Sequence, residues 1–164
     1  MNRTYKYPLE PNRRQAARLD EWLWRCRTLY NAALEQRRDV WTNRQRSLGY
    51  VDQCSDLTEL RTSDPEYGAL PVEVCRSPLR QLDRAFAAFF RRLKAGETPG
   101  YPRFKGRARF HSFSIGRVKV EGRKVRVPKL WLVRFRKYRE TQGEIRDVRI
   151  GRQAGRWYVA FSCE

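Results

Sequence analysis

The chain has little histidine, no paired cysteine motif and no long apolar run. Its single histidine, His111, and its four separated cysteines do not form a zinc-binding set, so we expect buried or free thiols and no metal or other cofactor. No apolar run approaches the roughly 20 residues that cross a membrane. The first residues also lack the apolar core of a signal peptide. We therefore expect a cytoplasmic protein with no membrane partner.

Acidic residues are also scarce, most of all in the second half of the chain. Between Arg91 and Arg139 the sequence has seventeen Lys or Arg residues and two acids, which is +15 of the whole chain's net charge of +18. Such a concentration of positive charge favours a polyanionic partner, and the phosphate backbone of a nucleic acid is the commonest polyanion. The apolar fraction of 40% and the aromatic fraction of 13% indicate a globular protein instead of a disordered basic tail.

The first part of the chain predicts one strand followed by helices. Residues 2–9 alternate as in a short strand that ends near Pro8. Asn12 and Gln15 have the spacing of a capping box, and the apolar positions that follow predict a helix to about Arg46. Further helices are expected over 52–61 and 72–95, separated by a loop at 62–68. Pro78 is unfavourable in a helix interior, so either Ser77 caps a helix that begins at Pro78 or the helix kinks there. We favour an N-terminal turn at 72–77 that leads into the helix.

After residue 97 the hydrophobic period changes from helix to strand. A hairpin is expected around Gly122, and three more strands cover 130–138, 145–150 and 157–161. This order predicts an α+β fold, a small β-barrel with a helical insertion after its first strand. The expected divisions are the first barrel strand at 1–10, a helical lobe at 11–96 and the remaining barrel at 97–164.

Five sequence blocks, in order, resemble the N-terminal half of TnpB-type transposon proteins. The first block contains both Pro11-Asn12-Arg13-Arg14-Gln15 and Cys26-Arg27-Thr28-Leu29-Tyr30-Asn31, and the second begins at Leu82-Asp83-Arg84-Ala85-Phe86. The best-known signature is Gly100-Tyr101-Pro102-Arg103-Phe104-Lys105-Gly106-Arg107, and Val127-Pro128-Lys129-Leu130 and Gly155-Arg156-Trp157-Tyr158-Val159 follow. Two local departures are Trp131, where the family usually has glycine, and Pro78 within the recognition helix.

The resemblance implies a function as well as a fold. TnpB proteins are RNA-guided DNA endonucleases related to compact type V CRISPR effectors. The implied fold is an OB-like wedge barrel with an inserted recognition lobe, and the implied partners are guide RNA and target DNA. The family's RuvC-like nuclease, with its metal-binding acids and zinc ribbon, follows the last block, so we expect no catalysis by this chain and allow a separate RuvC-like nuclease chain as a partner. A prokaryotic, nucleoid-associated location is expected.

Basic and aromatic residues in four regions are the candidates for nucleic-acid contact. The alternating cations after Gly100 predict an extended segment that follows phosphates, with Phe104 and Phe110 stacking on bases; core packing is an equal alternative for Phe104. The late part of the first helix would face the guide–target heteroduplex, and Tyr50 and Arg76 the family's DNA motif. The candidates are Arg37, Arg38, Arg44, Arg46, Tyr50, Arg76, Arg103, Phe104, Lys105, Arg107, Arg109, Phe110, Arg134, Arg136, Lys137 and Arg139.

Other functions fit the sequence less well. The main alternative is a transposase-associated helix-turn-helix protein that binds DNA sequence-specifically, but the long first helix shows no short turn into a recognition helix. An active metal-dependent nuclease would need converging carboxylates, and the aspartates are scattered. A ribosomal-type RNA binder would match the charge but not the five ordered blocks.

Overall fold

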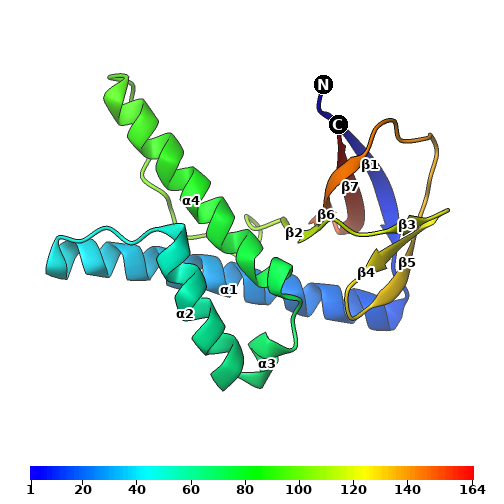
Figure 1. The fold of residues 1–164 in the computed structure, drawn as a ribbon, viewed down its shortest axis with the longest axis horizontal. Coiled ribbons are helices and arrows are strands. Elements are labelled where there is room, and N and C mark those ends of the chain that lie inside the picture. Colours follow the sequence, from blue (N-terminus) through cyan, green and yellow to red (C-terminus); the bar gives the residue numbers. More distant parts are fainter. The chain divides into compact units, whose positions relative to one another are not determined.

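The computed structural model describes residues 1–164, which form two compact units. The sheet unit contains Met1–Trp24 and His111–Glu164, and the helical unit contains Arg25–Phe110. The chain order of one strand, four helices and six strands confirms the predicted α+β class and the helical insertion after the first strand (Figure 1). The predicted functional division at residues 10 and 96 stays a prediction.

Most elements follow the sequence pattern, but the loop predicted at 62–68 contains the short helix Pro65–Gly68. The helices are α1 (Arg13–Arg44), α2 (Tyr50–Ser63), α3 (Pro65–Gly68) and α4 (Val72–Lys94). The strands are β1 (Arg3–Glu10), β2 (Ser112–Gly116), β3 (Val120–Glu121), β4 (Lys124–Val127), β5 (Trp131–Phe135), β6 (Ile145–Gln153) and β7 (Arg156–Cys163).

One antiparallel sheet contains all seven strands in the order β2-β6-β7-β1-β5-β4-β3. The long strand β1 joins its two halves, because Arg3–Pro8 pairs with β7 and Leu9–Glu10 pairs with β5. The strand therefore continues past Pro8, where it was expected to end. The edge strands β2 and β3 do not pair with each other, so the sheet is open where a barrel was expected. Strand β3 has only two residues, which is too few to pair along β2 and close the sheet into a barrel.

The core of the sheet unit is built around Tyr7. Its side chain is fully buried, and its ring centroid lies 5.3 Å from that of Phe135 on β5 and 5.7 Å from that of Phe161 on β7. Those two rings are 5.4 Å apart although their strands flank β1 on opposite sides. The sheet must therefore curl over Tyr7, which gives an open sheet the enclosed core of a barrel.

Strand β2 was not expected from the sequence. Phe113 and Ile115 are buried, and Ser114 donates a hydrogen bond from Oγ to Asp147 Oδ1 (2.5 Å) on β6. The alternation of serine with apolar residues at 112–115 is the strand signal that was missed.

The predicted capping box at the start of α1 is confirmed. The Asn12 amide donates to Gln15 Oε1 (3.0 Å), and the Gln15 amide donates to Asn12 Oδ1 (2.8 Å). Gln15 Nε2 also donates to the carbonyl oxygen of Leu132 (3.0 Å), which ties the first turn of α1 to β5. The cap therefore fixes both the start of the helix and its place on the sheet.

The predicted third helix over 72–95 is confirmed by α4, but a helix that begins only at Pro78, after a turn at 72–77, is wrong, because α4 runs through Pro78 without interruption. A proline in a helix leaves the carbonyl four residues earlier without its helical donor, here that of Val74. The buried thiol of Cys26 on α1 donates to that carbonyl at 3.3 Å. The freed acceptor is thus satisfied from a neighbouring helix, and α4 can bury Pro78.

All four cysteines are free thiols. Cys26 and Cys75 are buried in the helical unit and Cys163 in the sheet unit, whereas Cys54 is half-buried. Burial raises the pKa of the Cys163 thiol. The expectation of buried or free thiols is confirmed.

Candidate nucleic-acid interface

The basic segment after Gly100 forms no strand and contains a turn. Residues 98–111 form no strand, and a turn closes where the Arg109 amide donates to the carbonyl oxygen of Gly106 (3.0 Å). The alternation that predicted a single row of cations is therefore interrupted by this turn. Arg103, Arg107 and Arg109 are nevertheless exposed.

A reciprocal pair of hydrogen bonds fastens this segment to α1. The Lys105 amide donates to Asn31 Oδ1 (2.8 Å), and Asn31 Nδ2 donates to the carbonyl oxygen of Lys105 (2.9 Å). We call this pair the Asn31 clasp. It holds the backbone of the segment in one place on the helix, so the flanking cations are presented from a fixed backbone.

Aromatic rings accompany the cations next to the clasp. The guanidinium of Arg38 lies 5.5 Å from the ring centroid of Phe104, and the ammonium of Lys105 lies 5.9 Å from that of Tyr30. Phe104 is 47% exposed, so part of its ring remains available to a base or a ribose. Phe110 is buried against Tyr30, and burial raises the pKa of Tyr30. Phe110 therefore supports the segment from inside instead of stacking on a ligand.

Arg37 is buried among partners within the helical unit. Its Nε donates to Gln53 Oε1 (2.9 Å) and its Nη2 to Asp83 Oδ1 (3.0 Å), while its guanidinium lies over the ring of Phe86 at 4.9 Å. These contacts join α1 to α2 and α4. Arg38 and Arg44 on α1 and Arg46 in the connection after it, by contrast, are exposed, so these predicted cations can reach a ligand.

Tyr50 and Arg76, which were predicted together, belong to one electrostatic cluster. Burial is the main cause that raises the pKa of Tyr50, a hydrogen bond with Cys54 adds to it, and the charges of Arg80 and Arg76 oppose it. Glu73 binds Arg76 (3.3 Å) and Arg80 (2.5 Å). The cluster is only partly neutralised, because one carboxylate serves two guanidinium groups.

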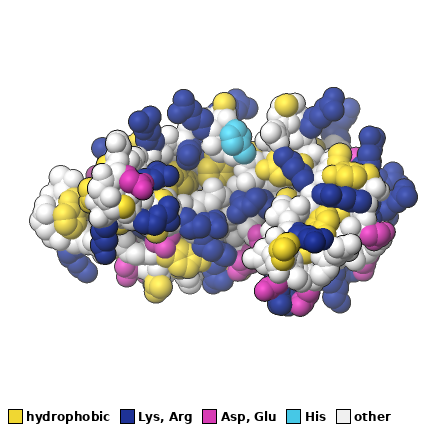
Figure 2. Space-filling model, turned by 90° about the horizontal axis from the view of Figure 1, so that it is seen from above, with side chains coloured by type: hydrophobic (Ala, Val, Ile, Leu, Met, Phe, Trp, Pro, Cys, Tyr) yellow, Lys and Arg dark blue, Asp and Glu magenta, His cyan; other side chains and the backbone are white.

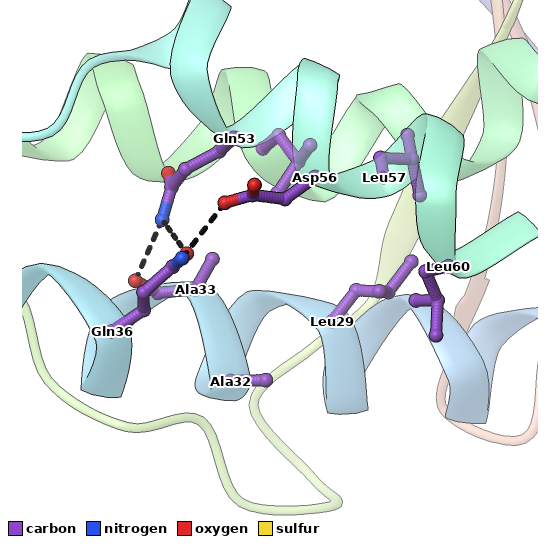
Figure 3. Close-up of a pocket in the computed structure, with 9 residues that line it drawn as sticks. Leu29, Ala32, Ala33, Gln36, Gln53, Asp56, Leu57 and Leu60 are labelled. Carbon is purple, nitrogen blue, oxygen red and sulfur yellow. Dashed lines mark hydrogen bonds between the residues drawn. The ribbon is translucent and has the colours of Figure 1, made fainter.

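A narrow pocket of about 260 Å³ between α1 and α2 has its polar groups already paired (Figure 3). Gln53 Nε2 donates to the carbonyl oxygen of Ala33 (2.9 Å), and Gln36 Nε2 donates to Asp56 Oδ2 (2.8 Å). Leucine and alanine side chains line the rest. This pocket therefore offers little to a charged ligand.

The sheet unit carries the second predicted set of cations, most of which have partners. Arg136 lies 3.3 Å from Glu10, and Lys137 lies 2.7 Å from Glu140. Arg139 stands over the rings of Tyr5 (4.9 Å) and Tyr138 (5.7 Å), and Arg134 is exposed. Exposed ion pairs contribute roughly 0–1 kcal/mol, so phosphates can replace these partners at little cost.

A groove of about 750 Å³ in the same unit contains residues that the sequence analysis did not select. Arg136 and Tyr138 line it together with Lys6, Arg156 and Tyr158. Lys6 Nζ lies 4.1 Å from the ring centroid of Tyr158 and donates to Gln153 Oε1 (2.5 Å). The alternation of β1 and β7, which puts Lys6 and Tyr158 on the face away from the core, was the available signal.

Charge on the drawn surface is mostly positive. Figure 2 shows Lys and Arg side chains spread over the face, with hydrophobic side chains between them and fewer acids. No three His, Cys, Asp or Glu residues come close enough to hold a metal ion, and no helix is long and apolar enough to cross a membrane. The fold and these surfaces define a basic α+β protein with cation–aromatic patches of the kind that bind nucleic acids.

Comparison with known proteins makes the relationship specific. Residues 1–46 match the family described as a helix-turn-helix domain (HTH_OrfB_IS605). InsQ, a candidate RNA-guided DNA endonuclease of Escherichia coli (strain K12), is 27% identical over 98% of this chain and 40% of its own length. A candidate RNA-guided DNA endonuclease of Streptomyces pristinaespiralis is 29% identical over 100% of this chain and 42% of its own.

The chain is thus homologous to TnpB-type RNA-guided endonucleases and corresponds to their N-terminal part. It spans about two-fifths of the length of these curated relatives. Among solved structures, a Cas12f1 chain from the cryo-EM structure of a Cas12f1–sgRNA–target DNA complex aligns over 100% of this chain and 48% of its own, with 12% identity and a TM-score of 0.47.

Proposed function

We propose that this chain is the nucleic-acid-binding module of a TnpB-like protein, which binds guide RNA and the guide–target DNA heteroduplex without cleaving either. The homology over nearly the whole chain supports the RNA-guided part of the proposal. The observation that carries the binding role is the basic segment around Lys105, held on α1 by the Asn31 clasp.

The cations of this segment act mainly on the phosphate backbone. Arg103, Arg107 and Arg109 are exposed and form no ion pair, so they can neutralise phosphates without losing a protein partner. Such contacts fix position and give salt-dependent affinity, while base pairing with a guide supplies the sequence information. Cleavage would come from a RuvC-like nuclease, which a separate chain could provide.

The affinity test compares two triple variants of equal charge. Arg103, Arg107 and Arg109 are changed to Ala in one, and the exposed Arg13, Arg14 and Arg123 in the control. Each lost phosphate contact lowers the slope of log K against log salt by roughly 0.7 for single-stranded nucleic acid, so the first triple should lose about 2 and the control little. Equal losses would mean that the whole +18 charge binds without a defined surface.

The guide test identifies the RNA that the protein selects. The chain is expressed beside its native flanking DNA, washed at high salt, and the co-purifying RNA is sequenced. One dominant RNA from the adjacent locus supports guide binding. A broad mixture of host RNAs contradicts it. Adding a RuvC-like nuclease chain in trans, with a matching target, then tests whether cleavage is restored.

A second candidate is a sequence-specific DNA-binding protein, which the description of the matched family favours. In the structure, however, residues 1–46 contain β1 and the single uninterrupted helix α1. A helix-turn-helix motif docks its second helix in the major groove, and this segment has no second helix. Preference for a duplex DNA over a structured RNA of equal length would favour this candidate.

A further inference from the structure

The helical unit contains an aromatic pocket of about 370 Å³ that the basic segment does not use. It is lined by residues of α1, α4 and the connection after α1, together with Tyr101. Five of the nine lining side chains are aromatic, two are arginine, and none is acidic. We call it the aromatic pocket. Its volume lies in the range of sites for small organic ligands.

One part of the lining is a packed cluster of rings. Phe89 lies 5.2 Å from Phe90 and 5.4 Å from Tyr101, measured between centroids, with the rings edge to face. Phe90 is 53% exposed and Tyr101 44%. The cluster is thus held in place from one side while large areas of two rings stay in contact with water.

Phe86 packs against Phe90 and Tyr101 in the same cluster, so the remaining aromatic side chain is Trp41, which α1 contributes. It is 54% exposed and packs against no other ring. A large apolar surface in a concave site is unfavourable in water, and a flat aromatic ligand is the partner that would cover it. The geometry therefore favours an occupant with a planar ring.

The charge of the lining selects among planar ligands. Arg37 is paired with Asp83, which lies outside the lining, whereas Arg46 is exposed and has no ion-pair partner. With no acid to compete, Arg46 attracts an anion. A planar ring joined to a negative charge describes a nucleotide, with stacking at the tryptophan and a phosphate at the arginine.

We propose that the aromatic pocket holds one unpaired nucleotide of a bound strand, with its base against Trp41 and its phosphate at Arg46. This inference rests on the proposed nucleic-acid-binding function and deepens it. Phosphate contacts do not distinguish a base from an empty sugar, but this pocket does. It gives the module a contact that is lost when the nucleotide is paired within a duplex.

The test compares two single strands of equal length and charge. One is an oligoadenylate RNA, and the other is an RNA backbone without bases. Binding of each is measured with the intact chain, Trp41→Ala and Trp41→Phe. Because stacking is worth roughly 1–3 kcal/mol per base, Trp41→Ala should weaken oligoadenylate binding about 5- to 140-fold and leave the baseless strand unchanged. Trp41→Phe should recover most of the affinity.

Two further variants complete the design. Trp131→Ala removes a more exposed indole (79% against 54% for Trp41) from the sheet unit and should change neither affinity. Arg46→Gln should weaken both strands and lower the salt slope by roughly 0.7, because its partner is a phosphate. It also keeps the proposal testable if Trp41→Ala fails to fold, which circular dichroism would show. A DNA oligoadenylate tests whether the pocket distinguishes the two sugars.

The outcomes separate this proposal from the proposed function. If the intact chain binds neither strand, the proposed function fails. If it binds both and Trp41→Ala weakens them equally, or neither, the aromatic pocket takes no base. Sedimentation of the unbound protein provides a last check: dissociation of a dimer by Trp41→Ala, with unchanged strand affinity, would assign the pocket to a second copy of the chain and overturn the proposal.

Discussion

Removing the Asn31 clasp should loosen the basic segment without unfolding the helical unit. Asn31→Ala deletes two hydrogen bonds, of 2.8 and 2.9 Å, that join α1 to the backbone of Lys105. A net contribution of about 1 ± 0.5 kcal/mol for each bond gives roughly 1–3 kcal/mol for the pair. This corresponds to an increase of about 5- to 140-fold in opening of the segment.

Amide hydrogen exchange at Lys105 measures this opening directly. Its amide should exchange faster in Asn31→Ala by the factor above, while amides in the middle of α4 keep their protection. RNA affinity should fall by at most the same factor, because only the fraction of molecules with the segment in place binds at full strength. Asn31→Asp keeps the acceptor for the Lys105 amide and should give an intermediate result.

Asn43 provides the matched control. It is exposed on the same helix, and Asn43→Ala makes the same chemical change away from the segment. It should alter neither the exchange of Lys105 nor RNA affinity. The reasoning is refuted if Asn31→Ala leaves the exchange of Lys105 unchanged, or if RNA affinity drops far more than exchange rises.

Three further predictions concern stability. Trp131 has a φ of 64°, in the left-handed region, so Trp131→Gly should raise the free energy of unfolding by up to about 1 kcal/mol, whereas Trp131→Ala keeps the Cβ and should not. Cys26→Ala leaves the buried carbonyl of Val74 without its donor and should cost about 1–3 kcal/mol, with Cys26→Ser losing less. Burial raises the pKa of Tyr7, so its stabilisation is complete below about pH 10 and is lost as pH rises through the folded-state pKa; Tyr7→Phe should flatten this alkaline loss.

Urea unfolding measures all three. If Trp131→Gly lowers the free energy of unfolding, the exposed indole stabilises the protein by more than the left-handed backbone at Trp131 costs. If Cys26→Ala and Cys26→Ser are equally stable, the hydrogen bond from the Cys26 thiol does not explain how α4 accommodates Pro78. The tyrosine prediction fails if Tyr7→Phe and the unchanged chain lose stability in parallel as pH rises above 10.0, the ordinary pKa of tyrosine.

Local sequence signals predicted most of the fold. The Asn12–Gln15 cap, the end of α1 and the hairpin around Gly122 each depend on neighbouring residues, and the structure has all of them. The failures depend on residues far apart in the chain. Pro78 is accommodated by a thiol about fifty positions away, and the curl of the sheet depends on how β1 divides its pairing between β7 and β5.

The kinds of residue in the candidate site could be predicted from the sequence, but their arrangement in space could not. Composition identified the basic segment. The alternation of its cations, however, does not reveal the turn at Gly106 or the hydrogen bond between the Lys105 amide and Asn31. Burial of Arg37 and Phe110 likewise depends on the packing of several elements. The aromatic pocket was missed because Trp41 and Phe90 are distant in sequence, and each alone looks like an ordinary helix residue.

The buried thiols give each unit a reporter of its own opening. Cys26 and Cys75 lie in the helical unit and Cys163 in the sheet unit, so an alkylating reagent reaches them only when that unit opens. Mass spectrometry of labelled peptides would therefore time the two openings separately in a single sample. Bound RNA that slows labelling of Cys26 and Cys75 but not of Cys163 would identify the helical unit as the part that a guide stabilises.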